Sequence, residues 1–129
     1  MAEARTHLGV DSRWVGEVLA LDEGIARVGL VTTAEMVVDE YGLIHGGFVF
    51  GLADYAAMLA VNDPHVVLGA AETRFLQPVS LGDSLVAEAS LEAEEGHKRL
   101  VFVQVRRGST TVFSGQFTCF VLEHHVLEQ

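Results

Sequence analysis

The sequence predicts an α+β fold in which one long, buried helix is wrapped by a curved antiparallel sheet of five to six strands. The first observation is an apolar segment over residues 46–62, which is long for a strand and right for a helix. The second is a series of strand-like segments after Pro64 that are joined by short turns. Short turns imply antiparallel neighbours, and only this sheet is available to cover the helix.

Length and composition favour one domain. The chain has 129 residues, half of them hydrophobic, so we expect a single domain over residues 1–129 with a real core. Its formal charge of −10 makes nucleic acid and anionic membrane surfaces poor partners, because both attract basic surfaces. Cys119 is the one cysteine, which excludes an internal disulfide framework and suits a reducing compartment. Residues 1–14 contain no apolar signal region, so we expect a cytoplasmic protein.

The elements before the sheet follow in chain order. Residues 1–13 are polar and are expected to form a short helix or an arm. Residues 14–33 alternate as strands do on either side of a central turn, which predicts a hairpin or a long bent strand pair. The helix over 46–62 carries one charge, Asp54, and is too short to cross a bilayer. Pro64 limits the helix, because proline disfavours the helical conformation in the residue before it.

Four strands are predicted after the helix, and their apolar residues alternate. They cover residues 66–79, 84–93, 98–106 and 110–122, and residues 123–129 are expected to fray. The residues expected to share a face within each strand are Leu85, Ala87, Ala89, Leu91 and Ala93, then Val101, Val103 and Val105, then Phe113, Phe117, Cys119 and Val121.

A specific pattern stands where the helix begins. It reads Gly42-Leu-Ile-His45-Gly46-Gly47, with Asp54 following inside the helix and FLQPVSLGD over residues 75–83. The pattern resembles the HGG…D motif of hotdog-fold acyl-CoA thioesterases of the PaaI type, and the resemblance covers roughly residues 14–122. It implies the hotdog fold and hydrolysis of an acyl-CoA or acyl-carrier thioester without a cofactor. No cysteine and histidine set has structural zinc spacing, so we expect no metal.

The start of the helix is suited to binding a carbonyl oxygen. Two glycines let a substrate approach the backbone closely, and first-turn N–H groups have no partner within the helix and lie at the positive end of its dipole. Such an N–H can donate to a thioester carbonyl and to the oxyanion formed from it. The resemblance implies that Gly46 is this donor, that Gly47 lies against the substrate, and that His45 fixes the loop and the carbonyl.

Asp54 is the one ionisable residue in the helix interior. A carboxylate there costs several kcal/mol unless it is paired or solvated through a site. The resemblance implies that Asp54 is the catalytic carboxylate, either as a general base on water or as a nucleophile that attacks the thioester. The alternative is a structural carboxylate that caps a buried loop.

The spacing of Gly46 and Asp54 predicts a shared site. Eight residues place them about 12 Å apart along one helix. Reacting groups must lie within roughly 3–3.5 Å of the atom on which they act, so one helix cannot supply both to one carbonyl. Two antiparallel helices from two subunits can. This agrees with the family, whose sites lie at a two-fold dimer interface, often within a tetramer.

Two positions depart from the family pattern. Asp39 stands where relatives often have asparagine, six residues before the motif histidine. Residues 68–71 lack the hydroxyl that relatives often use to orient the attacking water. Glu72 and Thr73 follow directly, and either they substitute for that hydroxyl or they have no role.

Coenzyme A is anionic, and the basic residues of the chain cluster on the predicted sheet. Arg74, Arg99 and Arg106, together with Lys98 and Arg107, are candidate contacts for its phosphates. The alternative is an ordinary solvated sheet edge.

A second class of function stays open, a non-catalytic acyl-CoA-binding module. Residues 75–83 and 112–117 also resemble the ligand domain of fatty-acid repressors that sense malonyl-CoA. Those repressors carry an N-terminal DNA-binding segment, which residues 1–13 are not expected to form, and they lack the HGG…D pair. A hotdog dehydratase is a third possibility, but neither of its motifs is present.

Overall fold

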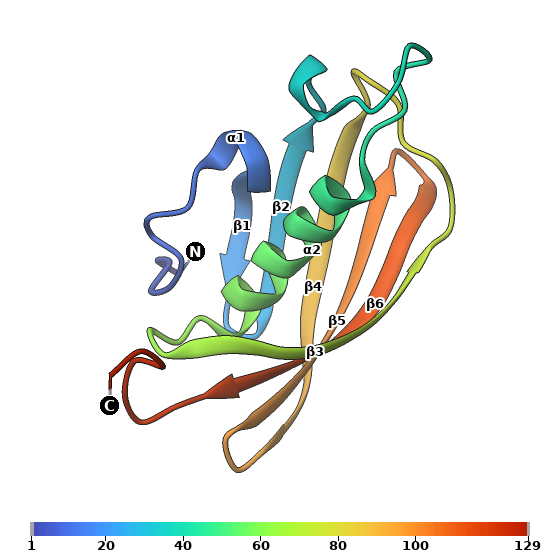
Figure 1. Ribbon diagram of the computed structural model, residues 1–129. Helices are drawn as coiled ribbons and strands as arrows, with labels where there is room; N and C mark the ends of the chain where they lie inside the picture. The colour runs from blue at the N-terminus through green and yellow to red at the C-terminus, as the bar shows by residue number, and fades with distance from the viewer. Residues whose placement is uncertain (1, 129) are drawn as a thin grey trace.

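The computed structural model describes residues 2–128, which form a six-stranded antiparallel sheet curled around one long helix (Figure 1). The strand order is β1-β2-β4-β5-β6-β3, and the helix α2 lies in front of β2 and β4. This is the hotdog fold, so the predicted fold class is confirmed. The elements are α1 (Ser12–Val15), β1 (Glu17–Asp22), β2 (Ile25–Val31), the short 3-10 helix η1 (Ala34–Met36), α2 (Gly46–Val61), β3 (Val66–Phe75), β4 (Ser84–Glu95), β5 (Lys98–Arg107) and β6 (Thr110–Val121).

Helix α2 begins and ends close to where the sequence predicts. The His45 side chain caps its first turn, and Asn62 follows its last residue in the left-handed conformation, with φ of 53°. Asparagine is one of the few residues besides glycine that often takes this position. No helix among residues 2–128 is long and apolar enough to cross a membrane. The buried side chains of α2 are small or unbranched at Cβ with few exceptions, and they are Val49, Leu52, Ala53, Ala56, Ala57, Met58, Leu59 and Ala60.

The inner face of the sheet follows the predicted alternation in β5 and β6, but β4 departs from it. Its register shifts between Leu91 and Ala93, so that Ala93 is paired with Leu100 and is exposed. The prediction that Ala93 shares the inner face is wrong, because a β-bulge at Glu92 adds one residue to the strand. In a strand, an offset of one residue moves the following side chains to the other face.

Residues 2–11 form an arm that lies against the end of α2. The Asn62 side chain holds it, since its Oδ1 accepts the Arg5 N–H at 2.7 Å and its Nδ2 donates to the Glu3 carbonyl at 2.9 Å. Residues 123–128 form bends and turns after the last strand. The arm therefore uses the same asparagine that ends the helix.

One edge of the sheet is left open. Strand β3 is an edge strand that pairs with β6 alone, so its other side has free N–H and C=O groups. Phe75 stands opposite the buried Phe113, on the inner face, yet 57% of Phe75 is exposed. Unpaired backbone groups and an exposed aromatic ring therefore lie at the same edge.

Candidate functional site

The loop before α2 is held by its own backbone and by Asp39. The Asp39 carboxylate accepts hydrogen bonds from the Tyr41 N–H at 3.0 Å and the Leu43 N–H at 3.2 Å. The His45 N–H donates to the Met36 carbonyl at 3.0 Å. Aspartate and asparagine side chains both form such turns with the backbone two residues on. Aspartate at position 39 therefore fills the turn-forming role that asparagine would also fill.

The His45 imidazole caps the helix and leaves one amide free. Its Nδ1 accepts the Gly47 N–H at 2.7 Å, so in the neutral ring the proton is on Nε2. The Gly46 N–H has no acceptor within residues 2–128. It belongs to the first turn of α2, where the helix dipole is positive, so it can donate to a ligand oxygen.

Asp54 lies about two turns after the start of α2, on the same side of the helix as Gly47. Its Oδ1 is buried and has no hydrogen-bond partner in the described part of the chain. Burial raises the pKa of Asp54 to about 6, because desolvation disfavours the charged form. Burial, with a smaller contribution from the Asp54 charge, raises the pKa of the Cys119 thiol to about 12, so that thiol is unreactive.

The face of α2 between the two motif groups has room for a neighbour. A Cβ added at Gly51 would meet no atom within 4 Å. Gly46 and Asp54 lie about 12 Å apart along the helix, so within one chain they do not meet at one carbonyl. Gly51 lies between them in the sequence, at a point where the chain leaves open space beside the helix.

An apolar pocket of about 300 Å³ has Gly46 among its lining residues. A Cβ added at Gly46 would lie 3.2 Å from the Phe75 ring, so glycine leaves space for that ring at the helix start. Residues 75–79 are predicted from the sequence only as part of the family pattern, and no local signal marks them as a binding surface. The pocket is lined by Leu43, Ile44, Gly46, Val49, Phe75, Leu76, Gln77, Pro78, Val79 and Val112.

The candidate phosphate contacts on β5 are far apart. Arg99 and Arg106 lie near opposite ends of the strand, about 23 Å apart at the usual rise per residue. Each has an acidic neighbour, since Arg99 lies 3.6 Å from Glu94 and Arg106 lies 3.2 Å from Glu88. The structure therefore does not gather them into one phosphate site.

The candidate residues on β3 divide between the two faces of the sheet. Glu72 is exposed on the outer face, opposite Gln116, and Arg74 lies on the same face. Thr73 is on the inner face, close to Gly115, where an added Cβ would lie 2.7 Å from the threonine methyl group. Of all the predicted site residues, the structure brings together His45, Gly46 and Gly47, with Asp54 on the same helix.

Two other features lie apart from this region. A larger cavity of about 470 Å³ lies between α1 and strands β1, β2 and β4, and none of its lining residues belongs to the motif. Within residues 2–128 no group of three or more His, Cys, Asp and Glu side chains is arranged to hold a metal ion. The motif loop (residues 42–45), the start of α2 and Asp54 remain the candidate site.

The sequence is similar to a known family and to a solved structure. The thioesterase superfamily matches residues 41–114. The solved structure of the uncharacterized protein PH1136 from Pyrococcus horikoshii is 54% identical, with a TM-score of 0.97 and coverage of 98% of both chains. The matched residues include the motif loop, α2, β3, β4 and β5.

Three curated relatives carry different names. Methylthioribose-1-phosphate isomerase of Aquifex aeolicus is 43% identical over 122 residues, which are 94% of this chain and 27% of that protein. Transcription factor FapR of Caldanaerobacter subterraneus is 28% identical over 128 residues, 98% of this chain and 63% of that protein. Acyl-coenzyme A thioesterase PaaI of Escherichia coli is 31% identical over 114 residues, which are 84% of this chain and 76% of that protein. This chain thus spans less than two thirds of the length of the first two relatives.

Proposed function

This chain belongs to the thioesterase superfamily, and we propose that it hydrolyses an acyl-CoA or acyl-carrier thioester as an enzyme of the PaaI type in the cytoplasm. The observation that carries the proposal is the buried Asp54 Oδ1, which has no partner in the described residues. A buried carboxylate without a partner costs free energy, and perturbed groups of this kind gather at functional sites. The free Gly46 N–H on the same helix supplies the complementary donor.

Each group has a role in thioester hydrolysis. The Gly46 N–H donates to the carbonyl oxygen and stabilises the oxyanion. Asp54 takes a proton from a water whose oxygen bonds to the carbonyl carbon, the C–S bond breaks, and the thiolate takes up a proton. In the second route the Asp54 carboxylate itself bonds to that carbon, the C–S bond breaks and the thiolate leaves with uptake of a proton, and water then hydrolyses the anhydride to the free acid and the Asp54 carboxylate. A pKa of about 6 suits a base that is ionised at neutral pH and still accepts a proton.

The two roles belong to two subunits of a homodimer. Gly46 and Asp54 lie about 12 Å apart in one chain, whereas an antiparallel second helix brings Gly46 of one copy to Asp54 of the other. The open edge of β3, the exposed Phe75 and the free space at Gly51 support an interface on this side. Two such dimers form the tetramer that the family resemblance implies.

The apolar pocket beside Gly46 receives the acyl group. Its one polar side chain is Gln77, so a charged acyl end would lose its hydration there without compensation. The nucleotide end of coenzyme A lies outside it. Arg74 precedes Phe75 on the edge strand and takes part in no ion pair within residues 2–128, which leaves it available for a phosphate.

The alternative function is that of a module that binds acyl-CoA without hydrolysing it. The similarity to FapR over 98% of this chain favours it, since that protein is named a transcription factor and not an enzyme. The motif loop, the free Gly46 N–H and the buried carboxylate favour the enzyme.

Release of thiol from a panel of acyl-CoAs tests the proposal. Asp54→Asn keeps the side-chain shape and removes the charge, so kcat should fall by a factor of roughly 10² or more with KM nearly unchanged. Glu72→Gln is the matched control, because it removes a carboxylate from the outer face of β3. An active Asp54→Asn variant beside an inactive, folded Glu72→Gln variant would place the catalytic carboxylate on β3. Tight binding of acyl-CoA without turnover of any thioester would favour the binding module.

A further inference from the structure

Loop 76–83, which joins β3 to β4, forms one side of the apolar pocket. It supplies Leu76, Gln77, Pro78 and Val79 to the lining. The loop also touches the motif loop, since the Ile44 N–H donates to the Val79 carbonyl at 2.8 Å. The shape of this loop therefore sets both the pocket and the approach to Gly46.

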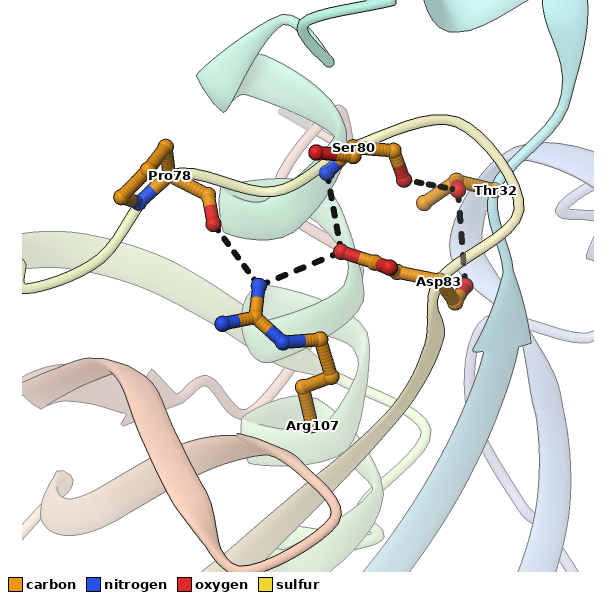
Figure 2. A network of polar contacts seen from close by, with 5 residues as sticks. All are labelled: Thr32, Pro78, Ser80, Asp83 and Arg107. Atoms are coloured by element: carbon orange, nitrogen blue, oxygen red, sulfur yellow. Dashed lines mark hydrogen bonds and ion pairs between the residues drawn. The ribbon is translucent and has the colours of Figure 1, made fainter.

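Arg107, from the end of β5, lies beside this loop and is bonded to Pro78 and Asp83 (Figure 2). Its Nη1 donates to the Pro78 carbonyl at 2.8 Å and to the Asp83 Oδ2 at 3.2 Å. The same Asp83 oxygen accepts the Ser80 N–H at 2.9 Å. One guanidinium and one carboxylate thus fix the loop at Pro78, Ser80 and Asp83.

Thr32 at the end of β2 completes the attachment (Figure 2). It is buried, and its hydroxyl donates to the Ser80 carbonyl at 2.9 Å. Its N–H donates to the Asp83 carbonyl at 3.0 Å. The loop is therefore attached to β2 through Thr32 and to β5 through Arg107.

The bonds of Arg107 differ from those of Arg27. Arg27 faces Glu88 at 3.5 Å with half of its side chain exposed, which is an ordinary surface pair. Arg107 is 34% exposed, Asp83 is 22% exposed, and the guanidinium also holds a backbone carbonyl. Its Nη1 makes both bonds within the chain, so Arg107 has a structural role in this loop that its charge alone does not predict.

We propose that Arg107 is a positioning residue that sets acyl-chain selectivity, by holding loop 76–83 against the pocket through Pro78 and Asp83. This rests on the proposed acyl site beside Gly46. Gly46, Leu76 and Pro78 line the same pocket, so a longer acyl chain buries more apolar surface against the loop than an acetyl group does. Loss of the Arg107 bonds therefore weakens binding of long chains and leaves short ones nearly unchanged. At about 300 Å³ the pocket is at the small end of ligand sites, which suits a compact or medium-length apolar acyl group.

The test uses non-hydrolysable thioether analogues of acetyl-CoA and octanoyl-CoA, with affinities measured by calorimetry. Arg107→Leu should weaken the octyl analogue by roughly tenfold, the low end of the effect of a changed apolar contact, and the short analogue by less than about twofold. Arg107→Lys keeps a charged donor and should restore most of the difference. Arg27→Leu is the matched control, since it removes an arginine from a strand ion pair away from the loop. Equal loss for both analogues, or the same change in Arg27→Leu, would overturn the proposal.

Hydrogen exchange gives a readout that needs no ligand. In Arg107→Leu the amides of Ser80 and Asp83 should exchange faster, while those in β2 keep their protection, and unchanged exchange in the loop would also overturn the proposal. Thermal unfolding shows whether each variant is folded. If wild type binds the analogues with this selectivity but hydrolyses no thioester, the selectivity inference stands and the proposed hydrolysis fails. If neither analogue binds wild type, the selectivity inference fails.

Discussion

The His45 Nδ1 atom accepts the Gly47 N–H at 2.7 Å, and this contact decides which amide at the start of α2 stays free. A side chain that capped the helix through the Gly46 N–H would occupy the donor that a thioester needs. By bonding to Gly47 instead, the imidazole stabilises the first turn and leaves the Gly46 N–H directed away from the helix. The motif histidine therefore caps the helix through the second glycine and leaves the N–H of the first glycine free.

The cap leads to a prediction at position 45. His45→Ala removes the acceptor and should lower the free energy of unfolding by about 1 kcal/mol, the usual cost of losing an N-cap. His45→Asn should restore that stability, because asparagine is a preferred N-cap. Urea unfolding measures the stability, and thiol release measures kcat/KM. If the histidine only caps the helix, activity recovers in His45→Asn together with stability. Recovery of stability without activity would assign His45 a direct contact with the substrate.

A second prediction concerns the contact between Gly46 and Phe75. A methyl group at Gly46 would lie 3.2 Å from the ring, so Gly46→Ala must displace Phe75 and narrow the pocket beside the donor N–H. We expect a fall in kcat/KM of roughly tenfold or more, the scale on which misplaced substrates lose rate. The double variant Gly46→Ala with Phe75→Leu relieves the crowding and should recover part of the rate. Equal activity in wild type, Gly46→Ala and the double variant would contradict this account of the helix start.

The fold was predictable wherever local signals agree with the packing. The segment from Gly46 to Asn62 combines helical length, small apolar residues and a downstream proline, and α2 ends one residue short of the predicted limit. The valines of β5 alternate without interruption, and they are buried as expected. The bulge at Glu92 has no such signal, because Ala93 continues the alternation and the extra residue depends on the pairing with β5.

The site was predictable only where residues are close in the sequence. His45, Gly46 and Asp54 belong to one motif and one helix. Asp83 and Arg107 are 24 residues apart and meet because β4 and β5 are neighbours, so no local pattern marks them. Charge alone places Arg107 with the other arginines, and charge does not show whether a side chain already has hydrogen-bond partners within the chain.

The dimer interface gives a prediction at Gly51. An added side chain there meets no atom of its own chain, and leucine favours a helix more than glycine does by roughly 0.8 kcal/mol, so Gly51→Leu should not destabilise the monomer. It should block the approach of a second α2, which would abolish dimers in sedimentation and activity with them. Gly9→Leu is the control, because Gly9 also has open space but lies in the N-terminal arm. A dimeric, fully active Gly51→Leu variant would place the interface elsewhere.

The raised pKa of Asp54 gives a prediction for stability. In the unfolded chain its pKa is near 3.8, and in the folded chain burial raises it to about 6, so the fold favours the protonated form. The destabilising effect is absent below pH 3.8, grows as the pH rises toward 6, and reaches at most about 3 kcal/mol above it. Asp54→Asn removes this effect and should raise the melting temperature at pH 7 more than at pH 4. A pH-independent difference between the variant and wild type would contradict the burial of an ionised carboxylate.

The same group predicts how activity depends on pH. Both proposed routes need an ionised Asp54, so kcat/KM should rise with pH and level off above about pH 6, with a slope that corresponds to a single proton. Glu72→Gln should keep this profile, because Glu72 is exposed on the opposite face of the sheet. Residual activity in Asp54→Asn should lose the acid limb, which separates loss of the base from a change in binding. The profile is measured by thiol release under kcat/KM conditions, within the pH range where circular dichroism shows the protein folded. A flat profile down to acid unfolding would show that no step depends on the Asp54 charge, and the assignment of Asp54 as base or nucleophile would fall.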